Sequence, residues 1–300
     1  MSRTIQAVLG VARAPFLWLP VTLVASGAAA GAYTGAFSWS HTLLALVGLV
    51  ALHASVNALN EAGDMRTGID LHTVRTPFSG GSGTLPAGLL TAGQARTFGL
   101  AMAGLGLAIG LFFLWRFGWT LLPIIVLGAI SVVAYTDVLA RMGFGEFFAG
   151  LGLGALPVMG AALVQGGVLG PAAIAAGIPA FLMTFNLLFL NEFPDEQADR
   201  AGGRHNLVLL LGRPVAAVLY VLLALATPAS IAVAVVRHAL PFVALVAILP
   251  SILLASPIRW ACTHPEEPVP IPALGGNVMW NLATNTLLAV ALFIAAAMRW

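Results

Sequence analysis

The sequence predicts an all-α, polytopic membrane protein, a bundle of nine transmembrane helices. Three observations support this fold class: 60% of the 300 residues are hydrophobic, only 8% are charged, and the mean hydropathy is +0.98. Soluble domains are about half apolar, and runs of about 20 apolar residues are typical of membrane-spanning helices. A transmembrane β-barrel would show short segments of alternating hydrophobicity instead, and the sequence has no such pattern.

Nine apolar runs are long enough to be the predicted spans. In chain order they cover residues 14–36, 41–59, 95–114, 119–138, 145–165, 170–190, 212–234, 238–256 and 278–298. No soluble domain interrupts them, so residues 1–300 are interpreted as one domain. Two glycine pairs, Gly106 with Gly110 and Gly150 with Gly154, have the small-xxx-small spacing that predicts close helix packing.

The arginines set the expected orientation of the bundle. All 13 basic residues are arginine, and most fall at the N-terminus or after even-numbered spans. These are Arg3, Arg13, Arg66, Arg75, Arg96, Arg141, Arg200, Arg204, Arg213 and Arg259, whereas Arg116, Arg237 and Arg299 fall on the other side. The positive-inside rule therefore predicts an inner-membrane protein whose N-terminus and even-numbered loops face the cytoplasm. All eleven carboxylate residues fall on that same side.

The remaining composition narrows the class of function. A net charge of +2 is too small for a nucleic-acid-binding surface, so no nucleic-acid partner is expected. Cys262 is the one cysteine in the sequence, which excludes an internal disulfide. Three polar intervals lie on the expected cytoplasmic side: 60–95, a loop or broken helix; 191–213; and 256–277, a proline-rich extended segment. We expect the functional site there.

Two clusters of acidic and amide residues occur in this charge-poor chain. The first is NALNEAGDMRTGID, residues 57–70, at the end of the second span. If that helix continues to about residue 66, Asn57, Asn60 and Asp64 lie on one face, because they are three and four residues apart. Asp70 follows a glycine at which we expect the helix to end.

The second cluster is NEFPDEQADRAGGR, residues 191–204, at the end of the sixth span. Asn191, Asp195 and Asp199 are four residues apart and again predict one helix face. Pro194 predicts a kink within this helix. The N-x-x-x-D pattern of the first cluster thus recurs, and chance repetition is improbable in so charge-poor a chain.

The chemistry that suits these clusters is binding of Mg²⁺ and a diphosphate. Carboxylates gathered in a partly dry cavity repel one another unless they are protonated or bind cations. Mg²⁺ prefers oxygen ligands and shares its coordination shell with substrate phosphates. The expected metal ligands are Asn60, Asp64, Asp70, Asn191, Asp195 and Asp199. The expected diphosphate or substrate contacts are Arg75, Arg200 and Arg204, whose guanidinium groups suit phosphate, and Asn57. The hydrophobic bundle is suited to an isoprenoid tail.

Other polar residues receive simpler interpretations. Single acids at helix ends are usually hydrated at the interface, and this interpretation is applied to Glu61, Glu192, Glu196, Glu266 and Glu267. His53, one turn before the first cluster, either packs between helices or contacts an acceptor. Asp137, beside Tyr135, either orients an acceptor hydroxyl or ends its helix.

At the two clusters the sequence resembles the UbiA superfamily of intramembrane prenyltransferases. The first motif matches as NALNEAGD, the second as NEFPDEQADRAGGR, and residues 135–161 resemble the family's loop after helix 4 and its glycine-rich fifth helix. The resemblance covers nearly the whole chain. It implies nine helices around a central cavity under a cytoplasmic cap. There, Mg²⁺ would bind a polyprenyl diphosphate, and the allylic carbocation would alkylate an aromatic acceptor.

The resemblance also implies roles by position. Asn60, Asp64 and Asp70 fall on the first motif, Asn191, Asp195 and Asp199 on the second, Arg75 and Arg204 on diphosphate-binding positions, and Tyr135 where an aromatic residue lines the site. The expected catalytic residues are therefore Asp64, Asp195, Asp199 and Tyr135. Glu61 departs from the motif, because the most similar branch more often has Asp there.

The acceptor is predicted from the finer pattern of these motifs. NALNEAGD with GID, and TPFSGGSGTLPAG, look most like the 1,4-dihydroxy-2-naphthoate polyprenyltransferase branch of menaquinone synthesis. Other acceptors, such as 4-hydroxybenzoate or lipid precursors, and terpene cyclisation are the alternatives within the superfamily. A cation-coupled transporter would carry its acids near the bilayer midplane. A CDP-alcohol phosphotransferase would carry a D-G-x-x-A-R-type signature, which this chain lacks.

Overall fold

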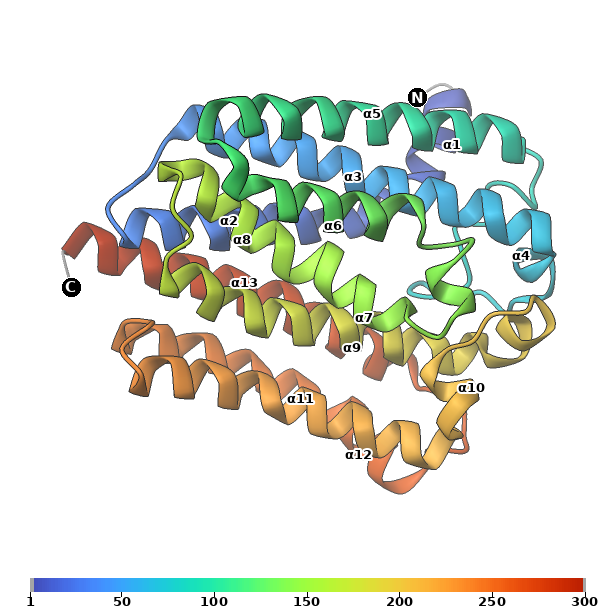
Figure 1. Cartoon of the computed structure of the whole chain (residues 1–300). Coiled ribbons are helices and arrows are strands. Elements are labelled where there is room, and N and C mark those ends of the chain that lie inside the picture. Colours follow the sequence, from blue (N-terminus) through green and yellow to red (C-terminus); the bar gives the residue numbers. More distant parts are fainter. Residues whose placement is uncertain (1–2, 299–300) are drawn as a thin grey trace.

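The computed structural model describes residues 3–298 as a bundle of long helices (Figure 1), and these residues contain no strand. In chain order the elements are α1 (Arg3–Val11), η1 (Ala14–Leu17), α2 (Trp18–Tyr33), α3 (Trp39–Thr67), α4 (Ile69–His72), α5 (Ala92–Phe117), η2 (Trp119–Leu121), α6 (Leu122–Val133), η3 (Leu139–Arg141), α7 (Gly145–Gly150), η4 (Leu151–Ala155), α8 (Leu156–Gly166), α9 (Pro171–Ala201), α10 (Leu207–Leu211), α11 (Arg213–Val236), η5 (Phe242–Leu254), α12 (Ala255–Thr263) and α13 (Ile271–Met298). The predicted all-α fold class is confirmed.

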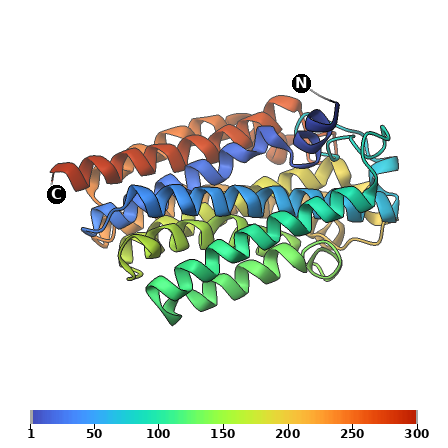
Figure 2. The ribbon, with the colours of Figure 1, turned by 90° about the horizontal axis from the view of Figure 1, so that it is seen from above.

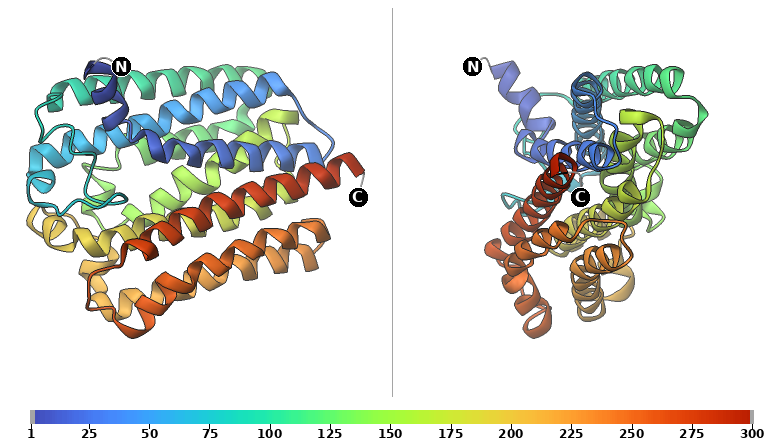
Figure 3. Two further views of the ribbon diagram at one scale, coloured as in Figure 1. Left: turned by 180° about the vertical axis from the view of Figure 1, so that it is seen from behind. Right: turned by 90° about the vertical axis from the view of Figure 1, so that its left-hand side faces the viewer.

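Eight helical segments of the described chain are long and apolar enough to cross a membrane. They are Ala14–Tyr33, Trp39–Thr67, Ala92–Phe117, Gly145–Gly166, Pro171–Ala201, Arg213–Val236, Phe242–Thr263 and Ile271–Met298. A ninth apolar helix, Trp119–Val133, is shorter. The helices run side by side in all views (Figures 2 and 3). The chain is therefore an integral membrane protein.

The fourth predicted span is wrong at its end. The structure ends this helix at Val133, where the expected range continued to residue 138. Residues 134–144 form turns and η3 instead. Fifteen residues of helix reach about 22 Å, which is less than the roughly 30 Å of a bilayer core.

The short elements α4, η3 and α10 gather at one end of the bundle, and α13 ends at the other (Figure 1). Two long helices lead into this gathered end, which we call the cap. α3 continues to Thr67, as predicted, and α9 runs unbroken for 31 residues with Pro179 and Pro194 inside it. The third polar interval was predicted to be extended, which is wrong for most of its length: α12 reaches Thr263 and α13 begins at Ile271. Arg299 lies outside the described residues.

Close helix packing depends on glycines, as one predicted pair shows. A Cβ added to Gly150 would lie 2.9 Å from the Phe181 carbonyl oxygen, and one added to Gly154 would lie 2.5 Å from that of Ala180. Both contacts join α7 and η4 to α9. The chain between α7 and α8 is π-helical over Leu151–Ala155, which widens the helix by one residue at this point.

Buried amides join the helices further along the bundle. The Tyr220 hydroxyl donates to Asn277 Oδ1 at 3.0 Å, and Asn277 Nδ2 donates to the Asn186 carbonyl at 3.0 Å. Asn186 Nδ2 in turn donates to the Tyr220 carbonyl at 3.2 Å. These three bonds close a ring between α9, α11 and α13 and fix their relative rotation, because polar groups in a membrane bundle pair with one another.

The close contact between Gly154 and α9 predicts that a larger side chain at this position lowers the stability of the fold. Gly154→Val places methyl groups against the α9 backbone, and overpacking of this kind costs about 1–3 kcal/mol. We expect a lower unfolding temperature in detergent. Gly104→Ala is the matched control, because a Cβ at Gly104 has no heavy atom of a described residue outside its own helix within 4 Å. Equal melting temperatures for the two variants would contradict the packing role.

Candidate active site

Both motifs line one small cavity at the cap. Its volume is about 80 Å³, and its lining includes Asn60, Asp64, Asp70, Asn191, Asp195 and Asp199. The fold thus brings together all six predicted metal ligands, although the two motifs that contain them are about 130 residues apart in the sequence. Tyr135 and Arg204 line the same cavity, as expected, and Arg13, Glu192 and His205 join them.

Local backbone geometry brings the first motif to the cavity. α3 ends at Gly68, whose φ of 81° lies in the left-handed region that favours glycine, and α4 then carries Asp70 back to the site. The loop after α4 closes over this carboxylate at Gly81, where an added Cβ would lie 2.8 Å from Asp70 Oδ1. Glu61 anchors that loop by accepting hydrogen bonds from the Ser82 amide at 2.7 Å and hydroxyl at 2.6 Å.

Arg204 is the cation that joins the two motifs. Its guanidinium forms ion pairs with Asp64 of α3 and, at 3.2 Å, with Asp199 of α9. The chain turns back after α9, so that the Arg204 amide donates to the Asp199 carbonyl at 2.9 Å. Burial acts to lower the pKa of Arg204, but the neighbouring carboxylates outweigh it and raise the pKa, so the guanidinium stays charged.

Asn206 fixes the second oxygen of Asp199. Its Nδ2 donates to Asp199 Oδ2 at 3.0 Å, while its Oδ1 accepts the Leu209 amide at 2.9 Å and so caps α10. The Asp199 carboxylate therefore has partners on both oxygens. Beside it, burial raises the pKa of Tyr135 above the ordinary value, so its phenol is protonated and neutral at physiological pH.

Three carboxylates of the cavity keep an oxygen without a partner. Asp70 Oδ2, Asp195 Oδ1 and Glu192 Oε2 are buried and form no hydrogen bond with any described residue. Burial raises the pKa of Asp70 to about 6, and the charge of Glu61 adds to that rise. Buried anionic oxygens without donors are suited to a hard cation. No three His, Cys, Asp or Glu side chains between residues 3 and 298 form a ready-made metal site, so asparagine and substrate oxygens would complete the coordination.

Sequence reasoning missed a second cation of this cavity, Arg13. It follows α1 with φ 52° and ψ 53°, a left-handed conformation that is unfavourable for a non-glycine residue. Its guanidinium lies 5.1 Å from the centre of the Phe16 ring. Because Arg13 stands alone before the first span, the sequence shows it only as one of many topology-setting arginines.

The expectation that Glu61 and Glu192 are hydrated at the interface is wrong. Glu61 is 1% exposed and Glu192 is 8% exposed, because the cap folds over both. Glu146, which sequence reasoning left unassigned, is also buried and accepts the Leu207 amide at 2.5 Å. The expectation does hold for Glu266 and Glu267, which are exposed.

Three residues expected to contact diphosphate or substrate do not line the cavity. Arg200 is largely exposed and pairs with Glu196 at 3.0 Å. Arg75 donates to the Asp70 carbonyl at 2.9 Å from behind the loop. Asn57 Nδ2 donates to the Ala12 carbonyl at 3.0 Å. These three side chains bind other parts of the protein instead, and residue spacing in the sequence does not predict those contacts.

The structure also shows the contacts of His53 and Asp137, for each of which the sequence left two interpretations open. His53 is buried, and its Nδ1 lies 3.1 Å from the Leu49 carbonyl one turn earlier, as a packing histidine would. Asp137 forms an exposed ion pair with Arg66 outside the cavity. This pair connects the end of α3 with the turn after α6.

Solved structures with the same fold share little sequence with this chain. A UbiA homologue from Archaeoglobus fulgidus, bound to GPP and Mg²⁺, has a TM-score of 0.67 at 16% identity, covering 97% of this chain and 99% of its own. The apo structure of a UbiA homologue from Aeropyrum pernix K1 has a TM-score of 0.66 at 14% identity, covering 92% and 97%. A structure of digeranylgeranylglyceryl phosphate synthase has a TM-score of 0.66 at 16% identity, covering 99% and 100%. These likenesses establish the fold.

Sequence comparison gives the family. No curated protein matches the chain significantly. A family model described as the UbiA prenyltransferase family matches residues 18–282, a range that contains both motifs and all six nominated metal ligands. The chain therefore belongs to the UbiA prenyltransferase family.

Proposed function

We propose that this protein transfers a polyprenyl group from a polyprenyl diphosphate to an aromatic acceptor, with Mg²⁺ as cofactor. The observation that carries the proposal is the convergence of both motifs on one cavity that also contains two arginines and three carboxylates with unpartnered oxygens. Arginine and acidic side chains together suit a metal-bound diphosphate. The homologue from Archaeoglobus fulgidus that binds GPP and Mg²⁺ supports the same assignment.

Asp70 and Asp195 would hold the cofactor with the asparagines of the two motifs, and Arg13 and Arg204 would contact the diphosphate. When bound, Mg²⁺ neutralises charge that develops on the departing diphosphate. Arg204 is already charged and fixed between two carboxylates, so it needs little reorganisation as that charge develops.

The reaction breaks the bond between the first prenyl carbon and the diphosphate oxygen. A bond forms between that carbon and the acceptor, and the acceptor loses a proton. Most acids of the cavity are buried, which limits access of the water that would otherwise capture the allylic cation. Tyr135 lines the cavity as a neutral aromatic ring, and its face is suited to a neighbouring carbocation.

For the acceptor we propose 1,4-dihydroxy-2-naphthoate, as in menaquinone synthesis. The pattern NALNEAGD with GID and the stretch TPFSGGSGTLPAG support this choice. The distribution of arginines supports an inner-membrane location with the cap facing the cytoplasm, because Arg66, Arg75, Arg200 and Arg204 lie in or beside the cap.

Turnover by the purified protein tests the proposal. With geranylgeranyl diphosphate, Mg²⁺ and 1,4-dihydroxy-2-naphthoate we expect a prenylated product, detected by radiolabel and chromatography. Asp195→Asn should lower kcat at least about 100-fold, because it removes a carboxylate from the proposed metal site. Glu266→Gln, an exposed acid outside the cavity, is the matched control and should keep its activity.

The result also separates the alternatives. Product from 4-hydroxybenzoate alone would replace the naphthoate acceptor, and a hydrocarbon formed without acceptor would indicate a terpene cyclase. Intact diphosphate in every reaction of the folded protein would contradict a prenyltransferase function.

The raised pKa of Asp70 predicts that metal binding depends on pH. A proton competes with a cation for the carboxylate, so below its pKa of about 6 the metal affinity should fall with pH, by up to about tenfold per unit. Above pH 7 the Asp70 carboxylate is ionised and adds no further pH dependence to the affinity. Titration of Mg²⁺ by calorimetry from pH 5 to 8 measures this. Asp70→Asn should weaken binding and flatten the profile, whereas an unchanged profile in that variant would contradict the assignment.

A further inference from the structure

The two arginines that line the cavity at the cap differ in how their donors are used. Arg204 pairs with Asp64 and Asp199, whereas the Arg13 guanidinium forms no ion pair or hydrogen bond with any residue from 3 to 298. Its charge is nevertheless felt in the cavity: burial raises the pKa of Asp70, and Arg13 opposes that rise. The N–H donors of Arg13 are therefore available to an anionic ligand.

Arg13 reaches the cavity through a strained turn between α1 and η1. The left-handed backbone of this residue is closed by two local hydrogen bonds: the Arg13 amide donates to the Gly10 carbonyl at 2.7 Å, and the Phe16 amide donates to the Arg13 carbonyl at 2.8 Å. A strained residue persists only where the surrounding structure fixes it. The contacts that hold this turn therefore also determine where the guanidinium lies.

Asn57 of α3 holds the turn from the side of the bundle. Its Nδ2 donates to the carbonyl of Ala12, the residue before Arg13, at 3.0 Å. Next to this bond, Val11 is buried in one apolar cluster with Ala58 of α3. Asn57 itself does not line the cavity, although Asn60, one turn later on the same helix, does. The Asn57 amide thus binds the chain segment that carries Arg13.

The loop between α4 and α5 holds the same segment from the other side. A Cβ added to Gly10 would lie 2.2 Å from Thr84 Oγ1, so α1 lies directly against this loop. The hydroxyl oxygens of Thr84 and Ser82 are 2.8 Å apart, and the Ser82 hydroxyl donates to Glu61 Oε2 at 2.6 Å. The segment before Arg13 is therefore enclosed between α3 and a loop that α3 itself anchors.

Resting on the function proposed above, we propose that Asn57 is a positioning residue for Arg13. Its amide fixes the Ala12 carbonyl, and the left-handed turn that follows directs the Arg13 guanidinium to the diphosphate. Asn57 acts on the prenyl diphosphate through Arg13 and makes no contact with it. The segment α1–η1 is then part of the diphosphate site, although it is distant from both acidic motifs in the sequence.

A double-mutant cycle tests the coupling between the two residues. The probe is dimethylallyl thiolodiphosphate, which does not react, titrated with Mg²⁺ into the purified protein. Arg13→Ala should weaken its binding about tenfold or more, and Asn57→Leu, which removes the amide donor, about fivefold to tenfold. In the Arg13→Ala background, Asn57→Leu should have less than about a twofold effect. Asn57→Gln keeps an amide donor and should restore part of the affinity.

Two controls distinguish positioning from a general loss of the site. Arg3→Ala removes an exposed arginine of α1 that does not line the cavity, and it should leave binding unchanged. The affinity for Mg²⁺ alone should change less than about twofold in Asn57→Leu, because Asn57 is outside the cavity. Equal losses in both backgrounds, a parallel loss of Mg²⁺ affinity, or full affinity in Arg13→Ala would overturn the positioning role.

Limited proteolysis reports the turn without any ligand. Trypsin cleaves after arginine, and Arg3 and Arg13 begin and follow the same short helix. Asn57→Leu should speed cleavage after Arg13 about fivefold or more, since the turn opens more often, while cleavage after Arg3 stays unchanged. Mass spectrometry of the fragments measures both rates. Equal cleavage after Arg13 in the wild type and the variant would overturn the inference.

The two measurements also separate this inference from the function on which it rests. If the wild-type protein does not bind the thiolodiphosphate with Mg²⁺, the proposed function fails. The rate of cleavage after Arg13 still decides whether Asn57 holds the turn, because that rate depends on the protein alone.

Discussion

The interaction on which the cap depends is the placement of one guanidinium between two carboxylates. Asp64 belongs to α3 and Asp199 to α9, and Arg204 pairs with both. Without it, the acids of the two motifs would face each other in a buried cavity at a high electrostatic cost. The ion pairs also set the distance between the cap ends of α3 and α9. The cavity therefore has its shape before any ligand is bound.

The rest of the cap is built to keep this arrangement in place. Gly68 lets the chain reverse after α3, Glu61 ties down the loop above Asp70, and Asn206 holds Asp199 while it caps α10. The Glu61 and Asn206 side chains each bind a backbone amide and a second polar side chain. Carboxylate oxygens of Asp70, Asp195 and Glu192 form no such contacts, so they remain available to ligands.

Periodicity and hydropathy predicted most of the bundle, because both act along one helix at a time. The extension of α3 through the first motif and the shared face of the second motif followed from residue spacing. Residue spacing does not predict contacts between elements that are far apart in the sequence. Arg200 turns out to pair with Glu196, and Arg13 reaches the cavity through an irregular turn. Glu61 was misjudged because its burial depends on a loop that begins several residues later and folds back. The metal role of the six motif residues stays a prediction.

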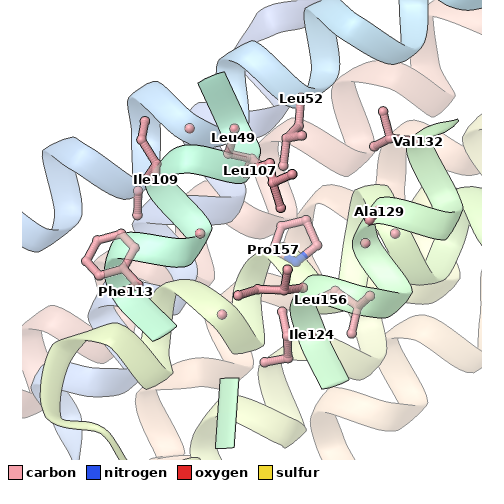
Figure 4. A pocket seen from close by; sticks show the side chains of 18 of the residues that line it. Leu49, Leu52, Leu107, Ile109, Phe113, Ile124, Ala129, Val132, Leu156 and Pro157 are labelled. Atoms are coloured by element: carbon pink, nitrogen blue, oxygen red, sulfur yellow. The ribbon is translucent and has the colours of Figure 1, made fainter. Parts of the chain in front are cut away.

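The π-helical stretch Leu151–Ala155 gives the fifth span two independent faces. Gly145 before it lines the polar cavity, whereas Leu156 and Pro157 after it line a separate apolar cavity between α3, α5, α6 and α8 (Figure 4). One inserted residue rotates everything beyond it by about 100° around the helix axis. Deletion of a single residue here would therefore rotate either the side chains before it away from the polar cavity or those after it away from the apolar cavity, although no side chain would be replaced. Because Gly154 also lies against the α9 backbone, both the length of this segment and the glycine at that position are constrained.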